Sequence, residues 1–300
     1  MEQEPLVSIV TPSFNSARYI EWTIQSVISQ DYPRIEYIVM DGASTDGTLS
    51  ILQRYSDRLQ YVSAPDGGVV DAINKGFDRS QGRIVAWLSA DDEYLPGAVG
   101  TAVRQFLKHP ETAVLYGEGA WIDGQGREMG PYPTTSPYRP QMLEQECGIC
   151  QPAVFMRREA VEGVGRLDPA LHFAFDYDLW IRLAAKYPFL AVPERMALSR
   201  MHRENKTLGK RREIFEENIR VLRHHYGYVP VNWVYGYLSF LRDGRDQYFE
   251  PLQHSAAVYS AALAVGSFYN LRHLWRFWKE WASRLTPESL ARVSKRGSGA

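Results

Sequence analysis

Cysteine is nearly absent from this sequence: the chain of 300 residues has two, Cys147 and Cys150, spaced as C-x-x-C. A tetrahedral zinc site needs four ligands, and no second cysteine pair exists to complete one. A redox dithiol is expected near a helix start in a thioredoxin-like unit, and the surrounding pattern does not indicate such a unit. We therefore expect no function for these cysteines and a reducing, cytoplasmic setting for the chain.

An excess of charge of either sign is also lacking. The chain has 34 Lys and Arg against 35 Asp and Glu, which gives a formal net charge of -1. No global field therefore recruits nucleic acid, and we expect no nucleic-acid partner. The first five residues are acidic and polar, unlike a secretory signal peptide.

Two glycine-rich motifs are missing as well. No G-x-G-x-x-G follows the first apolar run, and G-x-x-x-x-G-K-[ST] occurs nowhere in the sequence. The sequence therefore gives little support for a dinucleotide-binding domain or for a P-loop NTPase. What is present is a hydrophobic content of 45%, enough for a sizeable core, and an aromatic content of 13%. The aromatic content suits stacking on ring-shaped ligands or contact with a membrane interface, although large cores also use it.

Short apolar runs alternate with segments of helical periodicity over the first third of the chain. The runs that predict strands are residues 6–10, 35–40, 59–63 and 83–88, and the helical segments are residues 17–29, 48–55, 69–79 and the stretch from beyond 96 to about 108. Further strands are predicted at 113–116 and 151–156, loops and a hairpin at 117–140, and helices at about 175–183 and 211–225. This alternation predicts an α/β fold with a doubly wound, mainly parallel sheet.

Acidic residues follow three of the predicted strands. Asp41 and Asp66 follow the second and third strands, and the pair Asp91 and Asp92 follows the fourth. Open α/β sheets bind ligands at the carboxyl ends of their strands. Two adjacent carboxylates repel each other, so a stable fold gives them a cation or hydrogen-bond donors. A divalent ion that bridges a carboxylate and a diphosphate would fit, whereas the alternative is an exposed acidic turn.

Asp176 stands at the start of a predicted helix. A carboxylate there can cap backbone N–H groups, and this alone would explain an aspartate at the position.

Taken in order, these segments resemble glycosyltransferase family 2, inverting nucleotide-sugar transferases of the GT-A fold. The resemblance covers about residues 6–207, and its motifs are VTPSFN at 10–15, VMDGASTDGT at 39–48, DAINKG at 71–76, LSADD at 88–92, FDYDLW at 175–180 and RMH at 200–202. It implies a catalytic domain over residues 1–207. The pattern of the remaining residues, 208–300, predicts a helical extension that contacts a membrane interface or a second subunit.

The resemblance also implies roles for single residues. Thr11, Pro12 and Asp41 would line the nucleobase pocket, with Asp66 near the base or ribose and Asp91 near the ribose. Asp92 would bind the metal, Mn²⁺ or Mg²⁺, and His202 lies where some relatives contact the metal or the diphosphate; an ordinary surface histidine is the alternative. Asp176 stands at the position of the catalytic base, although Phe175 precedes it where family members often have Glu.

The implied chemistry is inverting transfer of a sugar, a hexosyltransferase-type reaction, from a nucleotide-diphosphate donor to a hydroxyl group. A cation at Asp92 would stabilise the leaving diphosphate, and Asp176, whose unperturbed pKa is about 3.9, would accept the proton of the acceptor. A UDP-sugar is the first expectation for the donor, and a saccharide or lipid-linked acceptor in cell-surface polysaccharide or glycolipid assembly is expected. The donor sugar, its base, the linkage and the oligomeric state are not readable from the residues. A nucleotidyltransferase and a non-catalytic nucleotide-sugar-binding protein are the alternatives.

The last fifty residues combine apolar and basic character. Residues 252–271 lack formal charge apart from His254, but their polar residues make them a poor membrane span. From Leu271 onward, Leu and Trp recur at helical spacing, and residues 270–300 carry seven Lys or Arg against two Glu. Such a helix suits an anionic membrane interface, for example the inner face of the plasma membrane; packing against protein is the alternative.

Overall fold

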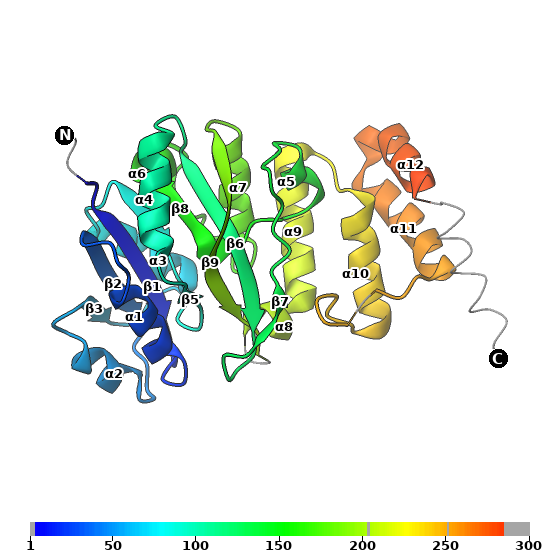
Figure 1. Ribbon diagram of the computed structural model, residues 1–300. Coiled ribbons are helices and arrows are strands. Elements are labelled where there is room, and N and C mark those ends of the chain that lie inside the picture. Colours follow the sequence, from blue (N-terminus) through cyan, green and yellow to red (C-terminus); the bar gives the residue numbers. More distant parts are fainter. Residues whose placement is uncertain (1–3, 203–204, 251, 285–300) are drawn as a thin grey trace. The chain divides into compact units, whose positions relative to one another are not determined.

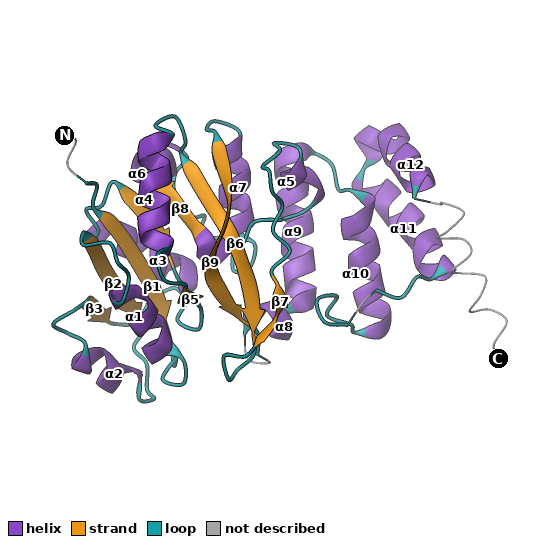
Figure 2. Ribbon diagram, viewed as in Figure 1, coloured by secondary structure: helices purple, strands orange, loops and turns teal. Residues whose placement is uncertain are grey.

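The computed structural model describes residues 4–202, 205–250 and 252–284. These residues form two compact units: the first contains residues 4–142 and 147–202, and the second contains residues 143–146 and the described residues from 205 onward. Figure 1 labels the elements of both units, and Figure 2 distinguishes their helices, strands and loops.

The first unit is built on a twisted sheet of mixed direction. Its strands are β1 Val7–Ser13, β2 Ile35–Asp41, β3 Gln60–Ser63, β4 Ile84–Trp87, β5 Glu93–Tyr94, β6 Val114–Ile122, β7 Glu128–Pro131, β8 Val154–Arg157 and β9 Phe189–Arg200. The order across the sheet is β3-β2-β1-β4-β8-β6-β9-β5, and β7 pairs with β6 as a hairpin. Strands β1 to β4 are parallel to one another, while β8 runs antiparallel to both of its neighbours. The predicted α/β fold with a mainly parallel sheet is confirmed.

Helices cover both faces of this sheet. They are α1 Ile20–Ile28, α2 Thr48–Arg54, α3 Val69–Arg79, α4 Ala98–Lys108, α6 Arg158–Gly163 and α7 Phe175–Ala184, with the 3-10 turn η1 Gln151–Ala153 before β8. Because side chains alternate along a strand, Val7 and Ile9 of β1 join a core with α1 and α4, whereas Val10 meets α3 on the opposite face. Figure 1 shows α1 and α4 in front of the sheet, and α3 behind it.

The sequence did not indicate one strand of this fold, β9, or the full length of another, β6. Strand β9 has twelve residues, but Pro193, Glu194 and Arg195 interrupt its apolar pattern. Strand β6 continues to Ile122, well past the predicted end at residue 116, because the glycines at 117 and 119 lie within it. A side chain at either glycine would clash: a Cβ at Gly119 would lie 2.4 Å from the sulfur of Cys150.

The second unit is helical. Its elements are residues 143–145 of α5 Met142–Gln145, α8 Lys206–Gly209, α9 Arg211–Tyr226, α10 Val231–Asp243, α11 Ala256–Tyr269, the 3-10 turn η2 Leu271–His273 and α12 Leu274–Ser283. On α9, which matches the helix predicted at 211–225, Ile219 and Leu222 are buried and Ile214 is half-buried. Among the residues that the structure describes, we find no helix with both the length and the hydrophobicity needed to cross a bilayer.

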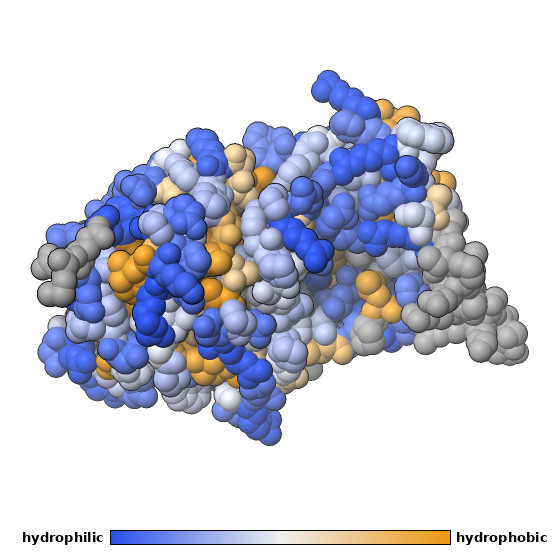
Figure 3. Space-filling model, turned by 45° about the horizontal axis from the view of Figure 1, so that its top comes forward, coloured by the Kyte–Doolittle hydropathy of each residue, from blue (hydrophilic) through white to orange (hydrophobic). Residues whose placement is uncertain are grey.

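The surface is mixed in character. Figure 3 shows long hydrophilic side chains spread over the visible face, with hydrophobic residues exposed between them.

Candidate functional site

The acidic residues singled out in the sequence converge on one edge of the sheet. Strands β1 to β4 are parallel, so Asp41 at the end of β2 and the loops that carry Asp66 and Asp91 lie at the same edge of the sheet. Strand β9 is parallel to β6, and both lie antiparallel to β8, as β4 does. The segment from Arg200 to His202 therefore emerges at the same edge.

Asp91 and His202 form the polar centre of this edge. The Nε2 atom of His202 lies 3.0 Å from the Oδ2 atom of Asp91, and the side chains are 15% and 27% exposed. The ring of Tyr19 packs against the imidazole, with centroids 4.7 Å apart. The Nδ1 atom of His202 is buried and has no hydrogen-bond partner among the described residues. A carboxylate and an imidazole thus meet where a ligand can still approach them.

Asp92 is in a different environment, although it is the adjacent residue. It is 7% exposed, and its Oδ1 atom accepts a hydrogen bond of 2.8 Å from the backbone N–H of Arg200. The hydroxyl of Thr23 donates to its backbone carbonyl at 2.8 Å. Burial, and then the charge of Asp91, raises the pKa of Asp92 well above its usual range. The carboxylate of Asp92 therefore faces the protein and joins the β4–β5 turn to the end of β9.

Arg200 organises this turn. Its guanidinium lies over the rings of Tyr19 and Trp22, 5.1 Å and 4.7 Å from their centroids. It donates hydrogen bonds of 2.9 Å to the backbone carbonyls of Asp91 and Asp123, and it also pairs with Glu93. The side chain is 1% exposed, so its charge is neutralised and hydrogen-bonded inside the protein.

The residues present fit a divalent cation that is shared with a substrate. No group of three or more His, Cys, Asp or Glu side chains placed to hold a metal ion occurs within the described residues. Mn²⁺ accepts both a carboxylate oxygen and an imidazole nitrogen, so an ion would replace the hydrogen bond between Oδ2 of Asp91 and Nε2 of His202. Mg²⁺-type sites commonly take one or two protein ligands and complete their coordination with substrate phosphates. Two protein ligands therefore suffice where a diphosphate binds.

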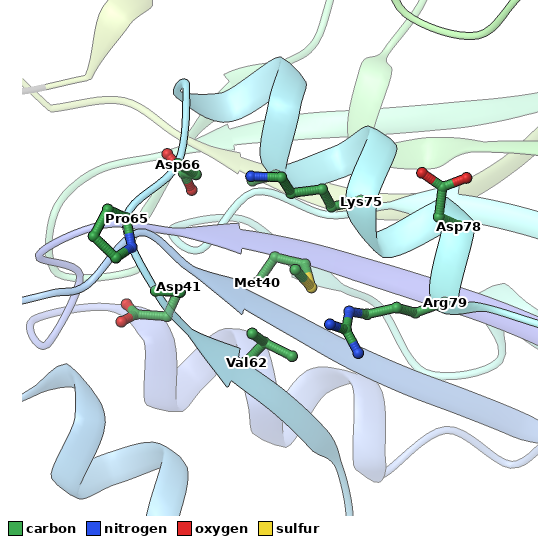
Figure 4. Close-up of a pocket in the computed structure, with 10 residues that line it drawn as sticks. Met40, Asp41, Val62, Pro65, Asp66, Lys75, Asp78 and Arg79 are labelled. Carbon is green, nitrogen blue, oxygen red and sulfur yellow. The ribbon is translucent and has the colours of Figure 1, made fainter.

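A pocket of about 410 Å³ lies beside this edge, against the end of β2. Asp41 and Asp66, both predicted to contact the nucleotide, line it together with Lys75 and Arg79 of α3. Figure 4 shows Asp41 and Asp66 at one end of the pocket and Asp78 and Arg79 at the other, with the ammonium group of Lys75 directed toward Asp66. Gly42 lies beneath Asp66, because a Cβ at this position would come within 3.1 Å of its carboxylate.

The two carboxylates of this pocket differ in what they can still bind. Asp41 is 2% exposed and already accepts hydrogen bonds from the backbone N–H and hydroxyl of Ser44 and from the hydroxyl of Ser63. Asp66 is exposed and accepts one from the backbone N–H of Gly68. Asp66 is therefore the carboxylate with acceptor capacity left for a ligand.

Thr11 and Pro12 lie on β1, opposite Val39 and Met40 of β2. Both are buried, and the hydroxyl of Thr11 is 3.1 Å from the hydroxyl of Tyr37, so this side chain is engaged inside the sheet. Neither residue lines the pocket.

Asp176 is the second residue of α7 and is half-buried. The helix begins after Ala174 without a side-chain cap, and Asp176 accepts a hydrogen bond from the backbone N–H of Tyr177. The ring of Phe175 lies 6.4 Å from that of Trp87, which precedes Asp91 by four residues on β4. Trp180, one turn further along α7, stacks on the same Trp87 ring at 5.4 Å. Through these rings the start of α7 lies against β4, the strand that precedes Asp91.

Sequence reasoning gave no role to several residues of this site. Arg200 belongs to the motif RMH, but its role cannot be read from the sequence, and neither can the roles of Tyr19 and Trp22. Nothing in the sequence marks a contact between an arginine and two rings about 180 residues earlier in the chain. The motif DAINKG was itself a signal, because Lys75 lines the pocket and Asn74 holds the loop before α7 through two hydrogen bonds to the backbone of Leu167.

Solved structures of two proteins share this fold. TarS of S. aureus, residues 1–349 in complex with UDP, is 16% identical with a TM-score of 0.57, and the match covers 78% of this chain and 71% of that one. The mannosyltransferase PcManGT from Pyrobaculum calidifontis, in complex with GDP-Man and Mn²⁺, is 19% identical with a TM-score of 0.59, over 98% and 84% of the two chains. The fold is therefore of the GT-A type.

Comparison of sequences also finds glycosyltransferases. The glycosyltransferase RP339 of Rickettsia prowazekii, itself uncharacterized, is 27% identical over 210 residues, which are 66% of this chain and 64% of that protein. Chondroitin synthase of Escherichia coli is 25% identical over 258 residues, which are 85% of this chain and 38% of the enzyme. The chain thus spans less than two thirds of the length of either relative. The family model for glycosyl transferase family 2 matches residues 8–165, more than half of the sequence. The chain therefore belongs to glycosyl transferase family 2.

Proposed function

We propose that this protein transfers a sugar from a nucleotide-diphosphate donor to a hydroxyl acceptor, with inversion and with the help of a divalent cation. One observation supports it best: Asp91 and His202 meet at 3.0 Å on the sheet edge beside a pocket lined by Asp41 and Asp66. This arrangement supports a cation site at Asp91 and His202 and a nucleoside site in the pocket. Family membership leaves the nucleotidyltransferase alternative without support.

Asp91 and His202 would hold Mn²⁺ or Mg²⁺ together with the donor diphosphate. This moves the metal-binding role predicted for Asp92 to its neighbour, because the carboxylate of Asp92 faces inward and accepts from the N–H of Arg200. When bound, the cation supplies positive charge against the negative charge that develops on the leaving diphosphate. Arg200 and Tyr19 keep the two ligands in place, one through the carbonyl of Asp91 and the other through the ring of His202.

Asp176 would act as the general base. The acceptor hydroxyl has a high pKa, so its proton must move to a base while the new bond to the anomeric carbon forms. The start of α7, which carries Asp176, packs against β4 through Phe175 and Trp87, and Asp91 follows β4 in the chain. With Asp176 as the base, the acceptor displaces the diphosphate in a single step, and the configuration at the anomeric carbon inverts.

The pocket would take the nucleoside of the donor. Asp66 has acceptor capacity for an N–H group, and uracil and guanine both present ring N–H donors, so a UDP-sugar remains the first expectation and a GDP-sugar the alternative. The relative chondroitin synthase supports a role in the assembly of a polysaccharide, and we propose a saccharide as acceptor.

Release of free nucleotide from candidate donors tests this function. We would incubate the protein with UDP-, GDP-, dTDP- and CDP-sugars, with Mn²⁺ or with EDTA, and measure the nucleoside diphosphate released. The expected result is slow hydrolysis of one donor class that depends on the cation. Thermal shifts over the same panel report binding separately, because a ligand of the folded state raises the melting temperature. Cation-dependent stabilisation without any hydrolysis would indicate a binding protein instead.

A further inference from the structure

Helix α11 is apolar on every side. Its fourteen residues, Ala256–Tyr269, include no charged side chain. Val258, Ala262 and Gly266 point inward, and Phe277 of α12 packs against Gly266 so closely that a Cβ there would lie 1.9 Å from its ring. The opposite face is exposed and consists of Ala257, Ala261, Ala264 and Phe268 beside Ala256 and Ser260. A helix that is apolar all round is normally covered on all sides, so we expect another surface to bind this exposed face.

The exposed apolar surface continues into α12. Leu271, Trp275 and Trp278 are 65%, 78% and 46% exposed, and they recur at the helical spacing i, i+4, i+7. The indole N–H of Trp278 donates to the hydroxyl of Ser267 at 2.9 Å, which joins this stripe to α11 beside Phe268. We call this set the α11–α12 surface: Ala257, Ala261, Ala264, Phe268, Leu271, Trp275 and Trp278. In Figure 3, hydrophobic residues are exposed among hydrophilic ones at this end of the chain.

The structure divides the Leu and Trp residues predicted to form one stripe. Leu274 and Trp281 are half-buried, and the indole of Trp281 donates to the carbonyl of Tyr259 at 3.0 Å. Leu285 lies outside the described residues. The inward residues thus hold α12 on α11, while Leu271, Trp275 and Trp278 are left for another contact.

Charges around the α11–α12 surface are positive. Residues 256–284 contain four basic side chains, Arg272, Arg276, Lys279 and Arg284, against one acidic side chain, Glu280. Arg276 pairs with Glu144 at 2.6 Å, and Glu280 accepts from the hydroxyl of Tyr228 and pairs with Arg284. Arg272 and Lys279 are exposed, and no ion pair of either is found among the described residues. An apolar surface flanked by these cations matches a surface of negative charge.

We propose that the α11–α12 surface docks on an anionic lipid membrane, with Trp275 and Leu271 in the interface and Arg272 and Lys279 against the lipid phosphates. Tryptophan favours the boundary between headgroups and acyl chains, and basic side chains beside an apolar face are typical of helices that lie in that boundary. A second copy of the chain fits less well, because a two-fold contact would bring the same cations together. This inference is independent of the proposed reaction.

Vesicle flotation of the full-length protein tests the docking. Vesicles of phosphatidylcholine alone are compared with vesicles of phosphatidylcholine mixed with phosphatidylglycerol. We expect the protein to float with the mixed vesicles and to remain in the soluble fraction with the neutral ones. Replacing Arg272→Glu and Lys279→Glu removes the attraction of two cations, each worth roughly a factor of five in partitioning, so at least a tenfold loss is expected. Leu271→Ser with Trp275→Ser is expected to cause at least about a tenfold loss by removing the inserted groups.

Matched controls come from α4. Leu107 is 53% exposed and the neighbouring Lys108 is exposed, so Leu107→Ser and Lys108→Glu change the same residue types in the other unit, outside the α11–α12 surface. These controls are expected to float like the unchanged protein, and all variants should keep the melting temperature and the donor hydrolysis measured without vesicles. Equal flotation of the surface variants and the controls would overturn the proposal, as would equal binding to neutral vesicles. A dimer in sedimentation that only the surface variants lose would also overturn it, in favour of a second copy.

Discussion

The carboxylate of Asp92 accepts a hydrogen bond of 2.8 Å from the backbone N–H of Arg200, and this bond separates the roles of two adjacent aspartates. Asp91 points toward His202 at the sheet edge, whereas Asp92 is held inside. We therefore expect Asp91→Asn to lower cation-dependent donor hydrolysis on the order of 10²-fold or more, since a charge that helps to stabilise the leaving group is lost. Asp92→Asn keeps an oxygen that can accept from Arg200, so hydrolysis should stay within about tenfold. Titration of Mn²⁺ at saturating donor distinguishes the two variants, and the reverse ranking would return the metal to Asp92.

Arg200 is predicted to contribute more to stability than any ordinary surface arginine. Its guanidinium is buried between the rings of Tyr19 and Trp22 and bonded to two backbone carbonyls. Arg200→Met leaves Glu93 and these carbonyls without their donor, and the loss of unfolding free energy should be about 3–5 kcal/mol. Arg195→Met is the control on the same strand, because its pair with Glu128 is 43% and 49% exposed and should contribute about 1 kcal/mol or less. Urea unfolding measures both; similar losses for the two variants would contradict the buried role.

The ends of the strands were predictable from the sequence, but the direction of each side chain was not. Asp41, Asp66 and Asp91 follow apolar runs, and parallel pairing brings such residues to one edge. Which aspartate faces outward depends on β9, and this strand was not predicted because charged residues in its middle interrupt the apolar pattern. The contact of Arg200 with Tyr19 and Trp22 joins segments far apart in the chain, so no local pattern records it. The sequence predicted that Asp41 and Asp66 contact the ligand, and the motif DAINKG marked the segment of Lys75, but the place of Lys75 in the pocket depends on how α3 packs on the sheet.

Two aspartates two residues apart on α7 should respond differently to the same substitution. Asp178 is 7% exposed and pairs with Arg182 at 2.7 Å, so Asp178→Asn should lower the unfolding free energy. Asp176 is half-buried at the helix start, and Asp176→Asn should reduce sugar transfer by about 10²–10⁴-fold through loss of a general base. Donor binding, measured by thermal shift, should survive in Asp176→Asn. Turnover near that of the unchanged protein would show that Asp176 only supports the start of α7.

Gly76 allows α3 to approach β1. A Cβ at this position would lie 2.3 Å from one methyl carbon of Val10 and 2.9 Å from the other, so Gly76→Ala overpacks a buried contact. The expected loss is about 1–3 kcal/mol, although alanine is the better helix former. Gly47→Ala is the control, because its Cβ would meet Ala17 at an ordinary 3.5 Å. In a double-mutant cycle Val10→Ala should recover part of the loss, and strict additivity would show that the clash is relieved elsewhere.

The two cysteines should react at very different rates in the folded protein. Cys150 is buried beneath Gly119, and burial raises the pKa of its thiol, so the reactive thiolate is scarce and inaccessible. Cys147 is half-buried, and we expect iodoacetamide at mildly alkaline pH to label it first. Mass spectrometry of the labelled peptides measures both rates, and Cys147→Ser is expected to leave the native protein nearly unlabelled. In urea both thiols should react at similar rates. Fast labelling of Cys150 in the native state would mean that the contact between β6 and the segment before β8 opens readily.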